Sequence, residues 1–377
     1  MISLARKIKR QLVGSEPLET PRKWMSSKAY AEQFGAKWHP VYKHTAIEKK
    51  IPTYYGDTPQ EYRTSFESQL CQAYPELGVL ELSQGSLIGS DGWIVSREGY
   101  LLPEHSWHGL NVDKIKVPQN LTKAKRSSLV YLSLASTWSY TNYGHFLLDA
   151  LPRLHLFQEA GFSLKDVDKI YCPLPKSSGS KKLLEKLGVP VEKCILSAFS
   201  GNEGIRANVL IAPSFPGLKR NYPEWIVDFL RKLINHPLPS QNRRLYITRG
   251  TGSRKPINEK ELIDILSKYD FEIYDPSRHT EPQNDFAEAE VIVGAHGAGL
   301  SDLVFCQPNT KVLELIPSDH VFTYYFSISE AAKLQYGCLI CPSLEERDPS
   351  SFGPSPFDFH VNLQEFEEAL IEMLKNV

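Results

Sequence analysis

Short apolar runs alternate with amphipathic stretches over most of the chain, and this alternation predicts strands and helices in turn. In the first half it predicts strands at 128–135, 168–172, 192–196 and 208–213, and helices at 142–161, 181–189 and 223–235. After a polar, proline-containing segment it predicts strands at 243–248, 271–276, 291–297 and 311–316, and helices at 258–269, 282–290 and up to Phe305. Repeated strand–helix units are typical of doubly wound parallel sheets, so the pattern predicts two α/β domains in tandem.

The polar segment 236–242 predicts a linker between these domains. We expect an N-terminal α/β domain over 1–238, with β-rich hairpins near 78–103 where Ser-Asp-Gly and Arg-Glu-Gly mark turns. A second α/β domain is expected over 239–345. The tail, 346–377, ends in an amphipathic helix at 363–374.

Composition excludes some classes of protein. Lys and Arg total 43 against 44 Asp and Glu, so no bulk charge favours nucleic acid as a partner. No run approaches the ~18 apolar residues that span a bilayer. Six cysteines in 377 residues do not suggest a disulfide framework, and Cys338 and Cys341 read as ordinary thiols in a strand rather than a zinc site. We expect a cytoplasmic protein.

The N-terminus, residues 1–14, is basic and amphipathic. Ile2, Ala5, Ile8 and Leu12 can share one helix face, with Arg and Lys around them. Such a helix can lie on an anionic membrane surface, here the inner face, or can be a solvated terminal helix. The sequence leaves both interpretations open.

A glycine-rich loop follows the apolar run at 291–295. Gly297, Ala298 and Gly299 come at a predicted strand-to-helix turn, next to His296. In doubly wound sheets ligands bind at the carboxyl ends of strands, and small residues at a helix start let backbone amides approach an anion. The alternative is a tight turn with a packed histidine.

Two arginines strengthen the anion interpretation. Arg249 follows another predicted strand, and Arg254 lies five residues further on. Arginine forks suit bidentate contacts with phosphate oxygens, which makes a diphosphate site plausible. The loop is neither a Walker A sequence nor the G-x-G-x-x-G dinucleotide fingerprint. We therefore expect a phosphate-bearing donor that is held in another way.

A second group of polar residues opens the predicted helix 142–161. His145 and Asp149 are four positions apart, so they share a helix face, and Asn142 can cap the helix start. A His–Asp pair is a reasonable proton acceptor, but the spacing equally fits a structural pair. The one D-x-D pattern, Asp166 to Asp168, precedes a strand instead of ending one, so we expect a solvated loop there and no metal site.

These motifs together resemble glycosyltransferase family 61. The matching features are "NYGHFLLDALPRL" (142–154), the "VIVGAHGAGLSDLVFCQPNTKVLELIP" segment (291–317), and a set between them. That set consists of Arg249, Arg254, Asn258, Glu259, Glu261 and Leu262. The resemblance spans roughly residues 127 to 317, and the first ~120 residues carry no such signature.

The resemblance implies a GT-B fold, with two Rossmann-like doubly wound domains facing a cleft. It implies transfer of a sugar from a nucleotide-diphosphate sugar, for which we expect UDP as the nucleotide, to a glycan acceptor. The transfer would invert the anomeric carbon and need no obligatory metal or other cofactor. Donor-binding residues would be Arg249, Arg254, Asn258, His296, Gly297, Ala298 and Gly299. Glu314, in the predicted strand 311–316, could bind the ribose or sugar hydroxyls of the donor, or could be a structural carboxylate. His145 would be the base with Asp149 holding it, or Asp149 would act directly, and Asn142 would lie on the acceptor side.

Because no signal anchor or disulfide pattern is visible, we expect a microbial enzyme of capsule or lipopolysaccharide synthesis. A catalytically silent nucleotide-sugar-binding or scaffolding subunit is the alternative. An unrelated Rossmann oxidoreductase is disfavoured by the missing dinucleotide fingerprint.

Overall fold

The computed structural model describes residues 12–16, 23–106, 123–176, 179–201, 203–217, 220–348 and 354–375. By their contacts the residues form two compact units: unit 1 is Met1–Thr45 with Ala73–Arg220, and unit 2 is Ala46–Gln72 with Asn221–Val377. The chain enters unit 2 within β4 (Thr45–Glu48) and leaves it within β6 (Cys71–Tyr74). The boundaries of these units differ from the division predicted at residues 238 and 345, and that division stays a prediction.

Unit 2 is built on a six-stranded parallel sheet in the order β18-β17-β19-β20-β21-β5. The strands are β18 (Glu272–Tyr274), β17 (Arg243–Ile247), β19 (Ala289–Ala295), β20 (Lys311–Pro317), β21 (Gln335–Cys341) and β5 (Thr53–Tyr55). Numbered from β17, the first five have the order 2-1-3-4-5, one of the two common doubly wound topologies. The order reverses between β17 and β19, and that switch point is where such sheets bind ligands.

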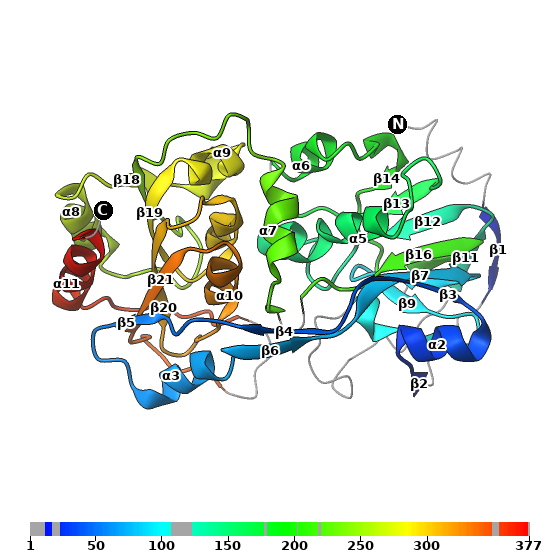
Figure 1. Cartoon of the computed structure of the whole chain (residues 1–377), viewed down its shortest axis with the longest axis horizontal. Helices are drawn as coiled ribbons and strands as arrows, with labels where there is room; N and C mark the ends of the chain where they lie inside the picture. Colours follow the sequence, from blue (N-terminus) through cyan, green and yellow to red (C-terminus); the bar gives the residue numbers. More distant parts are fainter. Residues whose placement is uncertain are drawn as a thin grey trace. The chain divides into compact units, whose positions relative to one another are not determined.

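Helices cover both faces of this sheet. In Figure 1, α8 (Glu259–Ser267) and α11 (Leu363–Leu374) lie against one face, and α9 (Pro282–Ala287) and α10 (Tyr324–Ala331) against the other. The 3₁₀ helix η7 (Ala298–Phe305) contacts α9, α10 and α7 (Glu224–Arg231). Every residue of β20 is buried, as expected for a parallel strand covered on both sides.

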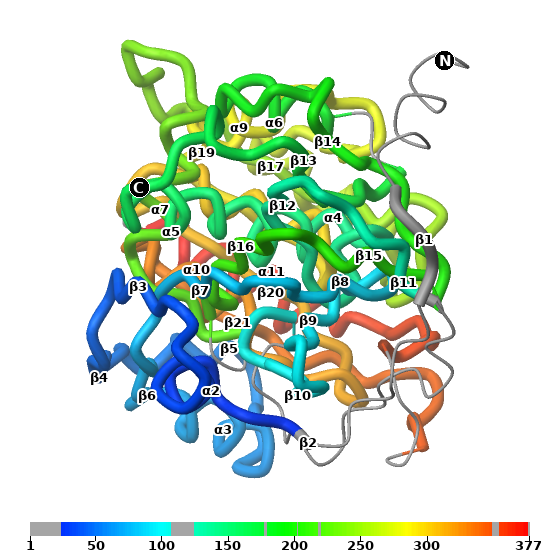
Figure 2. The backbone as a smooth tube through the Cα atoms, turned by 90° about the vertical axis from the view of Figure 1, so that its right-hand side faces the viewer, coloured from blue at the N-terminus to red at the C-terminus, as the bar shows by residue number. Residues whose placement is uncertain are grey.

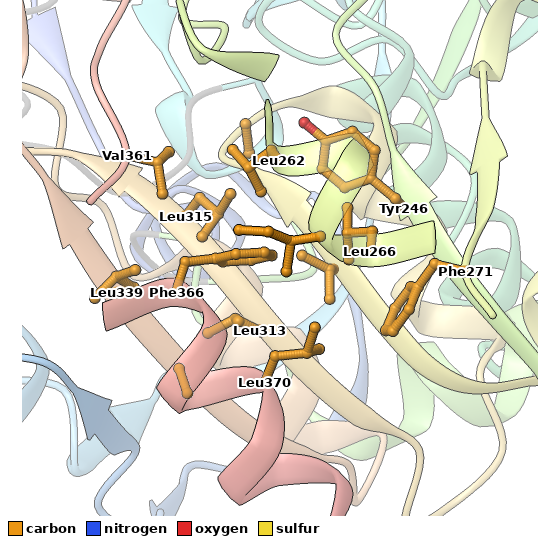
Figure 3. Close-up of a cluster of buried hydrophobic side chains, with 14 of the residues drawn as sticks. Tyr246, Leu262, Leu266, Phe271, Leu313, Leu315, Leu339, Val361, Phe366 and Leu370 are labelled. Carbon is orange, nitrogen blue, oxygen red and sulfur yellow. The ribbon is translucent and has the colours of Figure 1, made fainter. Parts of the chain in front are cut away.

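The core on the α8 and α11 side is aliphatic and aromatic (Figure 3). Leu313 and Leu315 of β20 meet Leu262 of α8 and Phe366 and Leu370 of α11, and all five are fully buried. Each such side chain contributes roughly 1.5–3 kcal/mol when it leaves water. Because side chains alternate along a strand, Glu314, between the two leucines, points to the opposite face of the sheet.

Unit 1 contains a mixed six-stranded sheet, in the order β14-β13-β12-β16-β7-β3. Its strands are β14 (Cys194–Ile195), β13 (Lys169–Tyr171), β12 (Val130–Ser133), β16 (Val209–Pro213), β7 (Leu77–Ser83) and β3 (Lys37–Tyr42). The first four strands are parallel to one another and follow the order 3-2-1-4 when numbered from β12. Strand β7 is antiparallel to both of its neighbours, β16 and β3. Strands β13, β12 and β16 can be followed in that order in Figure 2. Here the switch point lies between β12 and β16.

A mostly antiparallel seven-stranded sheet completes unit 1, in the order β1-β11-β15-β8-β9-β10-β2. Its strands are β1 (Leu12–Glu16), β11 (Lys123–Ser127), β15 (Glu203–Arg206), β8 (Ser86–Ile88), β9 (Trp93–Val95), β10 (Tyr100–Leu101) and β2 (Lys23–Trp24). Strands β8, β9 and β10 are antiparallel neighbours, which confirms the hairpins predicted near 78–103.

Several local predictions need correction. The helix predicted at 142–161 consists of α4 (Tyr143–His145), a π-helical turn η3 (Phe146–Ala150) and α5 (Arg153–Glu159), because Pro152 cannot donate a backbone hydrogen bond. The helix after the glycine loop is 3₁₀ rather than α.

The predicted N-terminal helix lies mostly outside the described residues, and its last apolar position, Leu12, begins strand β1. Within the described ranges no helix combines the length and the apolar character that crossing a membrane would require.

Candidate functional site

A pocket of about 220 Å³ lies at the switch point of the unit 2 sheet. It is lined by residues that follow β17, β18 and β19, at the carboxyl ends of these strands: Ile247, Thr248, Arg249, Asp275, Pro276, Ser277, Ala295 and Gly299. The predicted Arg249 and Gly299 therefore share one pocket. The topology, rather than proximity in the sequence, brings the three loops together.

Gly297 is needed because Arg249 occupies the space of a side chain there. A Cβ atom built on Gly297 would lie 1.5 Å from the Arg249 Nη1 atom. The backbone of Gly297 is extended, with φ 168° and ψ 171°, so the conformation itself does not require glycine. The glycine loop and the arginine predicted for one anion site are thus in direct contact.

Arg249 and Arg254 are both held by backbone carbonyls. Arg249 donates through Nε and Nη2 to Ser253 O, at 3.0 and 2.8 Å, and Arg254 donates through Nη1 to Ser355 O at 2.7 Å. Neither forms an ion pair with a carboxylate within the described ranges, and Arg254 Nε, which is buried, has no hydrogen-bond partner there.

The charges of the two guanidinium groups act on each other. Burial, together with repulsion by Arg249, lowers the pKa of Arg254 to about 10, and burial also lowers the pKa of Arg249. Arg254 adopts a left-handed backbone conformation, φ 57°, which is strained for a residue with a Cβ atom. Asp358 and Asp319 act on Arg249 and Arg254 through charge, but within the described ranges neither arginine forms an ion pair, so both cations suit an anionic ligand.

Two residues that the sequence did not single out join this cluster. Burial first, and then the charges of His296, Arg254 and Arg249 among others, lower the pKa of His320 to about 2. Tyr325 of α10 is buried and interacts electrostatically with Glu314, Arg249 and Arg254. His320 and Tyr325 therefore both lie within electrostatic range of the two arginines.

His296 and Glu314 form a buried pair behind the glycine loop. His296 Nδ1 lies 2.5 Å from Glu314 Oε1, and Tyr336 donates its hydroxyl to Glu314 Oε2, also at 2.5 Å. Burial raises the pKa of Glu314 to about 8. Glu314 was expected to contact the donor, but its exposed fraction is 0%, and both of its oxygens are engaged. These contacts fit the alternative of a structural carboxylate that holds His296, and the donor contact stays a prediction.

Asn258 was expected to bind the donor. It occupies the position before α8, but its side chain makes no capping bond. Instead its amide donates to Val361 O at 2.8 Å and accepts from Val361 N at 3.1 Å. These two bonds join the segment before α11 to the start of α8. They explain an asparagine at this position without a ligand. The donor-binding role stays a prediction.

In unit 1 the predicted polar group is assembled as its spacing suggested. Asn142 Oδ1 accepts from the backbone amides of Gly144 and His145, at 2.8 and 3.3 Å, which confirms the cap. His145 Nδ1 donates to Asp149 Oδ2 at 2.7 Å, with the His145 side chain 14% exposed and the Asp149 side chain fully buried.

This geometry leaves Nε2 of a neutral His145 as a lone-pair acceptor, because Nδ1 carries the proton that Asp149 accepts. Burial lowers the pKa of His145 in spite of the hydrogen bond to Asp149, so the imidazole is neutral near pH 7. The pair can therefore accept a proton. The choice between His145 and Asp149 as the acting base stays a prediction.

Sequence reasoning missed the surroundings of this pair. The Trp138 ring lies 5.5 Å from the His145 ring, and the Arg220 guanidinium lies 5.2 Å from the centre of the Trp138 ring. Trp138 and Arg220 both have positive φ, 63° and 60°, in loops that follow β12 and β16. Only their placement after predicted strands could have indicated them.

The aspartates of the D-x-D pattern lie in an exposed turn, as predicted. Asp166 accepts from Ser163 N and Asp168 from Val130 N, at the amino end of β13 rather than its carboxyl end. Cys338 and Cys341 are buried thiols in β21, which confirms that interpretation. In the part of the chain that the structure describes, His, Cys, Asp and Glu residues form no group of three that could hold a metal ion.

The comparison with known proteins agrees with the sequence resemblance. The family model for glycosyltransferase 61 matches residues 143–313, a range that includes His145, Asp149, Arg249, Arg254 and the 296–299 loop. A stretch of 55 residues is 46% identical to a β-1,2-xylosyltransferase, RCN11, of Oryza sativa subsp. japonica. That stretch covers 15% of this chain and 10% of the rice protein. The chain therefore contains a glycosyltransferase family 61 domain.

Proposed function

We propose that this protein is a glycosyltransferase that uses a nucleotide-diphosphate sugar, with the diphosphate bound in unit 2 by Arg249, Arg254 and the 296–299 loop. One observation carries the donor site: Arg249 lines a pocket at a sheet switch point, its charge acts on the nearby Arg254, and neither guanidinium forms an ion pair with a carboxylate in the described ranges. A diphosphate supplies the missing negative charge. The family match supports sugar transfer as the reaction.

In this proposal the transfer inverts the anomeric carbon. His145, held by Asp149, removes the proton from an acceptor hydroxyl, which then attacks the sugar carbon as the bond to the diphosphate breaks. The arginines stabilise the negative charge that develops on the leaving group, so no divalent metal is needed. The GT-B arrangement implied by the family, with acceptor and donor on facing domains, belongs to the same proposal.

The donor and acceptor are proposed from the family alone. We propose UDP as the nucleotide and a glycan such as a capsule or lipopolysaccharide chain as the acceptor. The name of the rice relative suggests a pentose as the transferred sugar. Action in the cytoplasm, with residues 1–14 on an anionic membrane surface, completes this proposal.

Binding of UDP to the full chain, measured by calorimetry in the presence of EDTA, tests the donor site. Wild-type protein should bind UDP, and Arg249→Ala should weaken binding by roughly 1.5–3 kcal/mol. Arg97→Ala, which removes an exposed arginine of unit 1, is the matched control. Equal affinity in the Arg249 and Arg97 variants would contradict the assignment. Tight UDP binding without transfer or donor hydrolysis would favour the silent-subunit alternative.

A further inference from the structure

The pocket in unit 2 extends beyond the arginines, across β17 to the end of β18. Asp275, Pro276 and Ser277 form its wall on the β18 side, while Arg249 and Gly299 line it at the switch point. The pocket therefore contains both a cation, Arg249, and a carboxylate, Asp275. A ligand that fills the pocket presents an anionic part to Arg249 and a part with hydrogen-bond donors to Asp275.

Asp275 is fixed by its own turn. Its Oδ1 atom accepts from the backbone amide and from the hydroxyl of Ser277, at 2.9 and 2.7 Å. Its Oδ2 atom lies 3.2 Å from Nε of Arg278, whose side chain is 82% exposed. The bonds from Ser277 lower the pKa of Asp275, so the group is ionised at neutral pH.

An ionised carboxylate accepts hydrogen bonds and donates none. It has about four lone-pair positions, and the contacts with Ser277 and Arg278 use three of them. One position remains for a ligand. That ligand group must be a hydroxyl or an N–H, because a phosphate oxygen would be repelled.

We propose that Asp275 binds the ribose hydroxyls of the donor nucleotide. This inference rests on the proposed function, which places the diphosphate against Arg249 and leaves the nucleoside to extend over β17 toward β18. Glu314, the carboxylate that the sequence suggested for such a contact, is fully buried and occupied by His296 and Tyr336. Asp275 is the pocket-lining carboxylate among the described residues.

The test combines a change in the protein with a change in the ligand. Calorimetry on the full chain compares UDP with 2′-deoxy-UDP and 3′-deoxy-UDP, for wild type and for Asp275→Asn. Asparagine keeps the capping bond to Ser277 but removes the charge. In the wild type, loss of the contacted hydroxyl should weaken binding about 10- to 150-fold. In Asp275→Asn, UDP itself should bind more weakly, and the difference between UDP and the deoxy analogue should shrink several-fold.

Asp270→Asn is the matched control, because Asp270 is exposed, lies outside the pocket, and has a positive φ that asparagine tolerates. It should leave all three affinities unchanged. If Asp275→Asn does not fold, Asp275→Ser retains a capping oxygen and serves instead.

The outcomes separate the two proposals. No UDP binding by the wild type would overturn the proposed function and this inference together. Tight UDP binding without discrimination against either deoxy analogue would overturn the ribose contact alone. Equal discrimination in wild type and Asp275→Asn would assign the ribose to other residues and also overturn it.

Discussion

Replacement of Gly297 by alanine should displace Arg249 without disturbing the backbone. A methyl group at this position would lie 1.5 Å from Nη1 and 2.5 Å from Cζ of Arg249, where ordinary contacts are 3.4 Å or more. The guanidinium must therefore move by about 2 Å, which breaks its bonds to Ser253 O. Because the extended backbone at Gly297 suits any residue, the fold should remain intact.

If Arg249 holds the diphosphate, Gly297→Ala should weaken UDP binding by about 1.5–3 kcal/mol, the range of a hydrogen bond to a charged group. Calorimetry on Gly297→Ala, Arg249→Ala and the double variant measures whether the two changes act through one contact. The double variant should lose little more than Arg249→Ala alone, because the displaced group is already gone. Gly201→Ala, where a Cβ atom meets nothing within 4 Å, is the control. Additive losses, or normal affinity in Gly297→Ala, would refute the reasoning.

The remaining predictions concern titratable groups. His145→Ala should lower turnover ~100- to 10,000-fold with UDP affinity unchanged, whereas exposed His44→Ala should change neither; normal turnover would make His145 structural. Burial lowers the pKa of His105 from 6.5 to about 3, so unfolding takes up a proton below pH 6.5. As pH falls from 6.5 to about 3, the free energy of unfolding should fall by about 1.4 kcal/mol per pH unit. His105→Gln should flatten this slope in denaturant titrations. Glu314 should change the free energy of unfolding in the opposite direction with pH. Its pKa is raised to about 8, so its contribution to stability is fully present below pH 4.5 and is lost as pH rises to 8. Glu314→Gln should remove that loss, and an unchanged slope would contradict the assignment.

The local elements could be predicted where the pattern of the chain is strong. Strands β17, β19 and β20 are apolar runs bounded by polar turns, and the Gly297 loop and Arg249 follow two of them. Helix α10 was not predicted, because Tyr325, Phe326 and Ile328 are all buried and it shows little amphipathic contrast. A helix buried on most sides carries a weak periodic signal.

Contacts between distant segments could not be read from local patterns. Strand β5 joins the unit 2 sheet beside β21, although more than 270 residues separate them in the chain. The pairing of His296 with Glu314 depends on the register of β19 and β20, which places Gly294 opposite Glu314. The Asp-Pro-Ser turn at Asp275 could have been noticed as a strand end, but its place in the pocket follows from strand order alone.

The two switch points in this chain differ in a way that supports the proposal of a nucleotide site in unit 2. In unit 1 the carboxyl ends of β12 and β16 are bridged by Arg153, which is fully buried and donates to Ala135 O and Pro213 O. His105 also bonds Pro213 O, at 3.0 Å. Because Arg153 and His105 are both fully buried, that crevice is filled by the protein's own side chains. In unit 2 the equivalent position holds a pocket, and its arginine lies against a glycine. The switch point is thus packed with the protein's own side chains in unit 1, whereas in unit 2 it leaves room for an anionic ligand.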